Sequence, residues 1–310
     1  MKRDLTYDFD FSAKEIWEIF ELTRKLKNKL RSRTLGSLRG RSLAMLFQKP
    51  STRTRVSFEV AMTQLGGHAL YLGPNDLQLS RGETIADTAR TLSRYVDGIM
   101  ARVFFHQDII ELAKNSTVPV INGLSDEFHP CQGLTDIYTI WEKLSFPKSF
   151  PRDFTIAFVG DGDNNVTNSL LLLCARLGIN FRIACPKEYQ TKEEILDLAK
   201  DDISKTKAGI KIINNPQEAV KDADVIYADV WVSMGRQDAE ERKRILAPYQ
   251  VNKELVFGAK EKVMVMHCLP AHRGEEITNE VIDGPNSIVF DQAENRLHVQ
   301  KAILVKLLNG

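Results

Sequence analysis

The sequence predicts an α/β protein of two doubly wound domains, each built on a parallel sheet. Three observations lead to this prediction. Short apolar runs alternate along the chain with segments whose apolar residues recur at helical spacing, which is typical of β-α units. The chain has 310 residues, more than one hydrophobic core usually spans. A stretch with two prolines, 143–153, interrupts the alternation near the middle.

The first predicted element is an amphipathic helix. Ser12 and Glu15 form a capping box, and apolar residues follow at helical spacing: Ile16, Ile19, Phe20, Leu26 and Leu30. Three predicted pairs of a strand and a helix come next, at residues 42–47 and 56–65, 98–103 and 108–114, and 117–122 and 134–144. With a boundary beside 143–153, the first domain is expected to comprise residues 1–146.

A second series of β-α units is predicted for residues 147–290. Its paired strands and helices are 155–160 with 168–178, 181–186 with a helix capped by Thr191 and Glu194, and 210–215 with 216–223. Residues 225–230, 263–267 and 287–290 supply further strands. A final amphipathic helix, within 291–310, is expected to pack back onto the first domain. Ligands are then expected at the carboxyl ends of the strands, in an active-site cleft between the domains.

Composition excludes several classes of function. The 42 basic and 41 acidic residues nearly cancel, so no overall field attracts nucleic acid or an anionic membrane. The four cysteines are widely spaced, which indicates free thiols and a cytoplasmic location. The N-terminus lacks an apolar signal segment, and the longest apolar stretch, 170–175, is far shorter than the roughly 18 residues of a membrane span.

Five polar residues, Ser-Thr-Arg-Thr-Arg at 51–55, stand between a predicted strand and a predicted helix. Unpaired backbone N–H groups at a helix N-terminus favour an anion, and hydroxyl and guanidinium groups add donors that suit phosphate. The segment lacks the G-x-x-x-x-G-K-[ST] pattern of a nucleotide-binding P-loop. Taken alone, it is equally consistent with Ser51 or Thr52 capping the helix while both arginines are solvated.

Five further motifs follow: MARV at 100–103, HPCQ at 129–132, DVWVSMG at 229–235, HCLP at 267–270 and AENR at 293–296. Together with PSTRTR, in this order and spacing, they resemble the aspartate/ornithine carbamoyltransferase family over essentially the whole chain. The SMG and HCLP elements are similar to those of its ornithine branch. The resemblance implies transfer of the carbamoyl group of carbamoyl phosphate to the side-chain amine of L-ornithine, giving citrulline and phosphate, with no cofactor and no metal.

The resemblance also implies which residues bind the donor. They are Ser51, Thr52, Arg53, Thr54, Gln78, Arg102, His129, Gln132, Cys268, Leu269 and Arg296. The 51–54 turn would hold the phosphate, Arg102 would bridge phosphate and carbonyl oxygen, and His129 would donate to that oxygen. Gln132 would contact the carbamoyl amide. Gln78 lies in a loop that, in the family, reaches the site of a neighbouring subunit, so a homotrimer or a multiple of trimers is expected.

The residues implied for ornithine are Asn165, Asp229, Ser233 and Met234. Cys268 is implied as the proton acceptor, with Asp229 close by, so that Cys268, Asp229 and Arg102 form the expected catalytic set. The attacking amine must be neutral, whereas the reference pKa of such an amine is about 10.4, so a placed acceptor is required. Whether Cys268 removes the proton or mainly shapes the pocket stays open.

Several alternatives remain beside this interpretation. His129, Cys131, His267 and Cys268 could be imagined around zinc, but their spacing is not that of structural zinc sites. A dinucleotide site is disfavoured because Asp163, Asn164 and Asn165 interrupt its glycine pattern. A related enzyme could use another amine acceptor, and a non-enzymatic anion-binding protein could share the scaffold. The sequence does not distinguish arginine synthesis from arginine breakdown.

Overall fold

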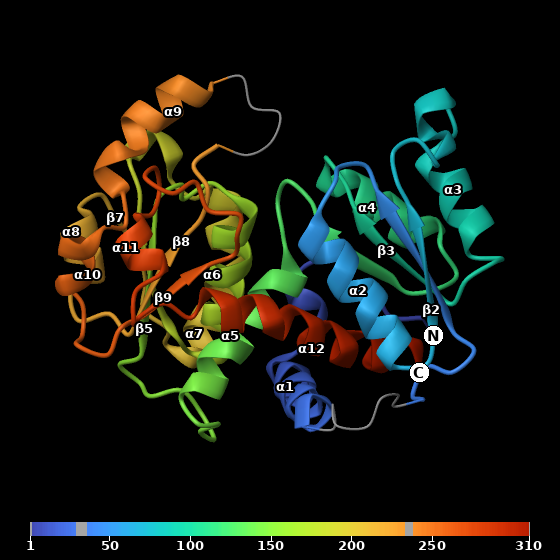
Figure 1. The fold of residues 1–310 in the computed structure, drawn as a ribbon, viewed down its shortest axis with the longest axis horizontal. Coiled ribbons are helices and arrows are strands. Elements are labelled where there is room, and N and C mark those ends of the chain that lie inside the picture. The colour runs from blue at the N-terminus through green and yellow to red at the C-terminus, as the bar shows by residue number, and fades with distance from the viewer. Residues whose placement is uncertain (1, 29–35, 233–237, 310) are drawn as a thin grey trace. The chain divides into compact units, whose positions relative to one another are not determined.

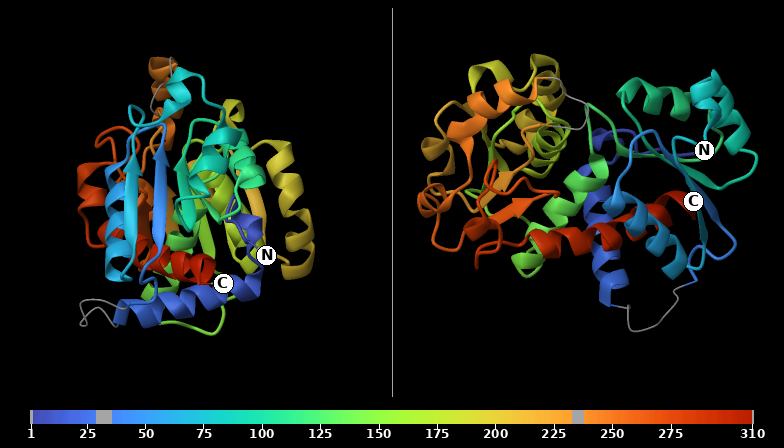
Figure 2. Two further views of the ribbon diagram at one scale, coloured as in Figure 1. Left: turned by 90° about the vertical axis from the view of Figure 1, so that its right-hand side faces the viewer. Right: turned by 45° about the horizontal axis from the view of Figure 1, so that its top comes forward.

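A computed structural model describes residues 2–28, 36–232 and 238–309 of the chain. It divides into unit 1, Met1–Tyr138 with Glu294–Gly310, and unit 2, Thr139–Ala293. Each unit contains one sheet whose strands are all parallel, which confirms the predicted fold class (Figures 1 and 2). No helix within the described residues is long and apolar enough to cross a membrane.

The sheet of unit 1 has the strand order β2-β1-β3-β4. Its strands are β1 (Ser42–Phe47), β2 (His68–Leu72), β3 (Gly98–Arg102) and β4 (Val120–Leu124). The helices are α1 (Ala13–Asn28), α2 (Thr52–Gln64), α3 (Ile85–Leu92), α4 (His106–Asn115) and α5 (Pro130–Lys143), with 3₁₀ turns at Asp8–Asp10 and Gln78–Arg81. The chain winds from β1 to β2 and then back past β1 to β3, so right-handed connections put α2 on one face and α3 and α4 on the other.

Local sequence accounts for the ends of the first helices. The Ser12 N–H donates to Glu15 Oε2 at 3.0 Å and the Glu15 N–H donates to Ser12 Oγ at 3.4 Å, so the predicted capping box is confirmed. Leu30, predicted to continue this helix, lies outside the described residues. Helix α2 ends before Gly66, whose φ of +85° suits glycine.

The sheet of unit 2 has the order β7-β6-β5-β8-β9. Its strands are β5 (Thr155–Val159), β6 (Asn180–Ala184), β7 (Ile210–Ile213), β8 (Val225–Ala228) and β9 (Met264–His267). The helices are α6 (Asn165–Leu177), α7 (Glu193–Thr206), α8 (Pro216–Val220), α9 (Ala239–Leu246), α10 (Lys253–Phe257) and α11 (Asn279–Ile282), with 3₁₀ turns at Lys187–Tyr189 and Ala247–Tyr249. Here the winding reverses between β5 and β8.

Two local predictions are wrong. Residues 287–290 do not form a strand: Ser287 makes a single bridge to Val265, and helix α12 (Val289–Leu308) begins two residues later. A four-residue apolar run suits either state, and Asp291 in the first turn favours a helix N-terminus. Thr191 does not cap α7, because its hydroxyl donates to the Gly162 carbonyl at 2.7 Å and Lys192 occupies the N-cap.

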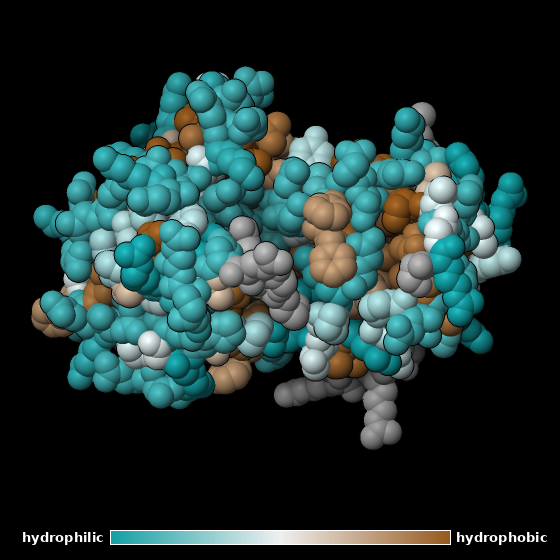
Figure 3. Space-filling model, turned by 90° about the horizontal axis from the view of Figure 1, so that it is seen from above, coloured by the Kyte–Doolittle hydropathy of each residue, from teal (hydrophilic) through white to brown (hydrophobic). Residues whose placement is uncertain are grey.

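The central strands are the most completely buried elements of each sheet. Every residue of β3 and β5 is buried, as expected for parallel strands covered on both faces. The face shown in Figure 3 is mostly hydrophilic, with hydrophobic residues in small groups. The edge strands are less covered: His68 and Leu70 are exposed in β2, and Lys211 is exposed in β7.

Candidate active site

Several of the predicted donor residues of unit 1 lie where the winding of the first sheet reverses. Phe47, the last residue of β1, is paired with Arg102, the last residue of β3. The Gln48 N–H then donates to the Arg102 carbonyl at 2.9 Å. The start of α2 and the Arg102 side chain therefore leave neighbouring strands at the same edge, which is where open α/β sheets bind ligands.

The 51–55 turn divides into two parts. Ser51 is the N-cap of α2: its Oγ accepts from the Thr54 N–H at 3.3 Å and donates to Thr54 Oγ1 at 3.1 Å. Arg55 points elsewhere, because its Nε donates to Glu59 at 3.0 Å and its guanidinium lies 3.8 Å from the centre of the Tyr71 ring. Ser51 can therefore cap α2 while the same turn binds an anion. Arg55 is directed to the surface of the protein and takes no part in that site.

His129 stands at the centre of the positive charge of unit 1. It is buried, and burial lowers its pKa well below the ordinary value. The charges of Arg296, Arg102, Lys49 and Arg53 lower the pKa further, in that order. At neutral pH the imidazole is therefore uncharged and can donate one N–H without adding a fifth positive charge.

Lys49 is a member of this cluster that sequence reasoning missed. Burial, assisted by the charge of Arg102, lowers its pKa to about 8. Its ammonium lies 5.3 Å from the centre of the Phe104 ring. Lys49 comes directly before the PSTRTR motif in the sequence, and this position is the feature from which its place in the cluster could have been predicted.

Gln132 and Arg296 come together although 164 positions separate them. Arg296 Nη1 donates to Gln132 Oε1 at 2.5 Å, and Nη2 donates to Thr54 Oγ1 at 3.3 Å. Gln132 Nε2 donates in turn to Asp136 Oδ1 at 2.7 Å. All four side chains are buried, so helices α2, α5 and α12 are joined by one internal polar network. Asp136 was not predicted from the sequence.

Gln78 lies apart from this group. It begins the 3₁₀ turn that follows the edge strand β2, its side chain is exposed, and its Oε1 accepts from Arg81 at 3.4 Å. The structure places it at the edge of the sheet rather than at the reversal between β1 and β3. Its contribution to a neighbouring subunit stays a prediction.

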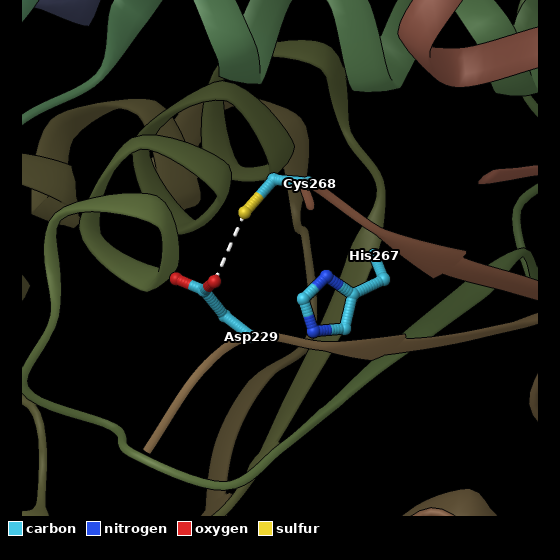
Figure 4. Close-up of side chains that lie close together, drawn as sticks. All are labelled: Asp229, His267 and Cys268. Atoms are coloured by element: carbon cyan, nitrogen blue, oxygen red, sulfur yellow. Dashed lines mark hydrogen bonds between the residues drawn. The ribbon is translucent and has the colours of Figure 1, made fainter. Parts of the chain in front are cut away.

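In unit 2 the pairing of β8 with β9 brings Asp229 and Cys268 together. Ala228 ends β8 opposite His267, which ends β9, so the next residue of each strand lies beside the other. The Cys268 thiol donates to Asp229 Oδ1 at 2.9 Å (Figure 4). Burial raises the pKa of Asp229, while His267, the thiol and the Val230 N–H act in the opposite direction. The carboxylate and the thiol thus form one hydrogen-bonded pair.

His267 holds the end of β9 in place. Its Nδ1 accepts from the Leu269 N–H at 2.9 Å, and its Nε2 lies 3.1 Å from Glu276 Oε1. Both side chains are fully buried. Asp229, His267 and Cys268 lie close enough to share an ion, but both ring nitrogens of His267 are engaged, which disfavours a metal site here. Glu276, like Lys49 and Asp136, was not predicted from the sequence.

The remaining predicted residues fall in two loops. Asn164 caps α6 by accepting from Val166 N at 2.9 Å and Thr167 N at 2.8 Å, and Asn165, the first residue of α6, is partly exposed. Ser233 and Met234 lie outside the described residues.

A buried ion pair joins the loop after β5 to helix α9. Arg242 pairs with Asp161, and its Nε donates to the Trp231 carbonyl at 2.8 Å. Its guanidinium also lies 4.2 Å from the centre of the Tyr189 ring. The pair was not predicted, because neither residue belongs to a motif noted in the sequence.

Comparison with protein families gives two matches. Residues 3–142 match the carbamoyl-P binding domain of aspartate/ornithine carbamoyltransferases, and residues 152–307 match the Asp/Orn binding domain of the same enzymes. The matches follow one another along the chain and together account for most of it.

Individual relatives are similar over nearly their whole length. The chain is 55% identical to an anabolic ornithine carbamoyltransferase of Pyrococcus furiosus, over 99% of this chain and 97% of the relative. It is 55% identical to an ornithine carbamoyltransferase of Methanosarcina acetivorans, over 99% of this chain and all of the relative. The solved structure of the Pyrococcus furiosus enzyme has a TM-score of 0.94 and covers 100% of this chain and 98% of that one. An anabolic enzyme of Campylobacter jejuni, 40% identical, has a TM-score of 0.92 over 100% and 99%.

Proposed function

Because the chain belongs to the aspartate/ornithine carbamoyltransferase family, we propose that it transfers the carbamoyl group of carbamoyl phosphate to the side-chain amine of L-ornithine. The observation that carries this proposal is the cluster of cationic side chains around a neutral histidine in unit 1. A dianionic phosphate and a carbonyl oxygen that gains charge need clustered donors rather than a nucleophilic side chain.

The donor would be held by the residues of unit 1. Ser51, Thr52, Arg53 and Thr54 bind the phosphate at the N-terminus of α2, where the backbone N–H groups add to the side-chain donors. Arg102 bridges the phosphate and the carbonyl oxygen, and His129 donates its N–H to that oxygen. Both groups stabilise the negative charge that develops on the oxygen as the amine attacks.

The acceptor would be held by the residues of unit 2. Asn165 with Ser233 and Met234 binds the amino acid end of ornithine. Asp229 and Cys268 lie beside the reacting amine, with Cys268 and Leu269 also lining the donor. The neutral amine forms a bond to the carbonyl carbon, the bond from that carbon to the bridging oxygen breaks, and phosphate leaves. The proton that the amine loses passes to the Cys268 sulfur as the thiol gives its own proton to the Asp229 carboxylate, with which it shares a hydrogen bond.

Ornithine is favoured over other acceptors by the names of the relatives. Those with 55% identity over nearly the whole chain are ornithine carbamoyltransferases, and one is named as anabolic. We therefore propose that the reaction serves arginine synthesis, and the widely spaced cysteines favour a cytoplasmic location. No cofactor is needed, since the leaving phosphate supplies the driving force for transfer.

We expect the enzyme to be a homotrimer or a multiple of trimers. The edge strand β2 and the neighbouring α2 expose apolar side chains, Leu70 and Val56, which a second copy could cover. Gln78 begins the 3₁₀ turn that comes after strand β2. Light scattering of the purified protein should give about three times the 35.1 kDa of one chain, or a multiple of that value. A molar mass of one chain would contradict the proposed assembly.

The activity is tested with ornithine and with alternative amine acceptors. Purified protein is incubated with carbamoyl phosphate and, separately, with ornithine, putrescine, N-acetylornithine or aspartate, and the carbamoylated product is measured. We expect citrulline from ornithine and at most about 1% of that rate with the other amines, because a site built to pair buried polar groups rejects analogues that lack them. Activity with another acceptor and none with ornithine would overturn the proposal.

A further inference from the structure

Three helices of unit 1 each contribute two polar residues to the internal network. The residues of each pair lie one helical turn apart: Gln132 and Asp136 on α5, Arg296 and Gln300 on α12, and Thr54 and Ser57 on α2. None of the six is more than 9% exposed. Hydrogen-bond direction inside the network is therefore set by the protein rather than by water.

The amide of Gln132 has one possible orientation in this network. An ionised carboxylate only accepts, so Asp136 Oδ1 requires the Nε2 end of the amide, 2.7 Å away. A guanidinium only donates, so Arg296 Nη1 requires the Oε1 end, 2.5 Å away. Asp136 and Arg296 therefore require the same orientation of the Gln132 amide. A carbonyl oxygen has two lone pairs, so Oε1 can accept a second hydrogen bond beside the one from Arg296.

The Arg296 guanidinium is held in turn by hydrogen bonds to Gln300. With its amide oriented so that both ends find partners, Gln300 accepts from Arg296 Nη2 at 3.0 Å and from Nε at 3.1 Å. Its nitrogen donates to Ser57 Oγ at 2.5 Å. The oxygen of Gln132 is thus placed by a chain of contacts with Asp136 at one end and Ser57 at the other.

We propose that Asp136 is a positioning residue that sets the choice of acyl donor, by holding the Gln132 amide with its oxygen toward the acyl group. The inference rests on the proposed function, in which Gln132 contacts the carbamoyl amide. Carbamoyl phosphate carries an NH₂ group where acetyl phosphate carries a methyl group of similar size. The Gln132 oxygen accepts a hydrogen bond from the NH₂ group but has no partner when a methyl group stands there. The site therefore discriminates between carbamoyl phosphate and acetyl phosphate.

The test compares Asp136→Leu and Asp136→Asn with the unchanged protein. Two constants are measured: the KM for carbamoyl phosphate and the Ki of acetyl phosphate as its competitor. Leucine has a similar shape and no acceptor, so Gln132 Nε2 loses its partner and the amide is held by Arg296 alone. We expect the KM to rise about thirtyfold and the Ki to change less than threefold, so that the ratio of Ki to KM falls about tenfold or more. Asparagine can still accept, so Asp136→Asn should give an intermediate ratio.

Thr135→Val is the matched control, because Thr135 is equally buried on α5 and its hydroxyl donates to the Cys131 carbonyl of the same helix at 2.7 Å. This variant should keep the Ki to KM ratio of the unchanged protein. If both Asp136 variants lose affinity for the two acyl phosphates equally, Asp136 merely supports the fold and the inference is wrong. If the unchanged protein forms no citrulline, the proposed function fails, and the inference with it.

Discussion

The substitution Asp229→Asn is expected to lower kcat/KM for ornithine about a thousandfold while the KM for carbamoyl phosphate changes less than threefold. Asparagine has the same shape, but it carries no negative charge beside the amine and offers only one oxygen where the carboxylate has two. Loss of one partner of a buried charge pair costs about 3 to 5 kcal/mol, which corresponds to this factor. Steady-state kinetics with each substrate varied in turn measures both constants.

The pH dependence of the same constant gives an independent check. Burial raises the pKa of Asp229 above the ordinary 3.8. The charged carboxylate is present above that raised pKa and is lost as the pH falls through it, so kcat/KM for ornithine should fall at a higher pH than an ordinary aspartate would cause. This acidic limb should disappear in Asp229→Asn.

The stability of the variant separates a functional effect from damage to the fold. Burial raises the pKa of Asp229, so ionising this carboxyl is less favourable in the folded chain than in the unfolded chain, and the buried group costs stability at pH values above its ordinary pKa. Asp229→Asn should therefore have an unchanged or higher Tm. Cys268→Ser serves as the matched variant, since a serine hydroxyl can still donate to Asp229, and it should lower kcat about tenfold with little change in Tm. A kcat/KM for ornithine within threefold of the unchanged value in Asp229→Asn would remove Asp229 from the mechanism.

The second large effect is expected from Arg53→Ala. Arg53 is partly buried in the first turn of α2, and its charge acts on His129, which places it within the cationic cluster. Removal of one guanidinium from a phosphate site costs about 3 kcal/mol, so the KM for carbamoyl phosphate should rise about a hundredfold. The KM for ornithine should stay within threefold. Inhibition by inorganic phosphate should weaken in parallel.

Arg55→Ala is the control for this prediction. Arg55 lies two residues away on the same helix, but its side chain contacts Glu59 and the Tyr71 ring. It should leave both KM values unchanged, since exposed ion pairs contribute little. Equal losses of affinity for both substrates in Arg53→Ala would show that this arginine supports the fold rather than the phosphate.

Much of the fold could be predicted because buried parallel strands have a plain pattern. Residues 42–47 and 155–159 are short apolar runs, and each forms a strand within those bounds. The helices that follow them have their own apolar spacing and caps. The errors fall where the pattern is short: the four residues 287–290 suit a strand or a helix, and only the contacts of α12 select the helix.

The candidate site was less accessible to sequence reasoning. Asp229 and Cys268 are 39 residues apart, and they meet because β8 and β9 pair in a register that local pattern does not specify. Their selection therefore depended on motifs. Asp136 and Glu276 gain their importance from side-chain hydrogen bonds to Gln132 and His267, and the residue types around them do not distinguish them from ordinary helix and loop residues.

Because helix α12 lies at the end of the chain, unit 1 can complete its folding only late in synthesis. Unit 1 combines residues up to 138 with residues from 294 onward, so its last segment leaves the ribosome after all of unit 2 has been synthesised. That segment supplies Arg296 and a set of fully buried apolar side chains, Val299, Ala302, Ile303 and Leu304. Domains generally fold as they emerge, but the nascent first unit keeps a hydrophobic surface uncovered until translation is nearly finished. A truncated polypeptide therefore lacks the arginine of the donor site and exposes the core that quality-control proteases recognise.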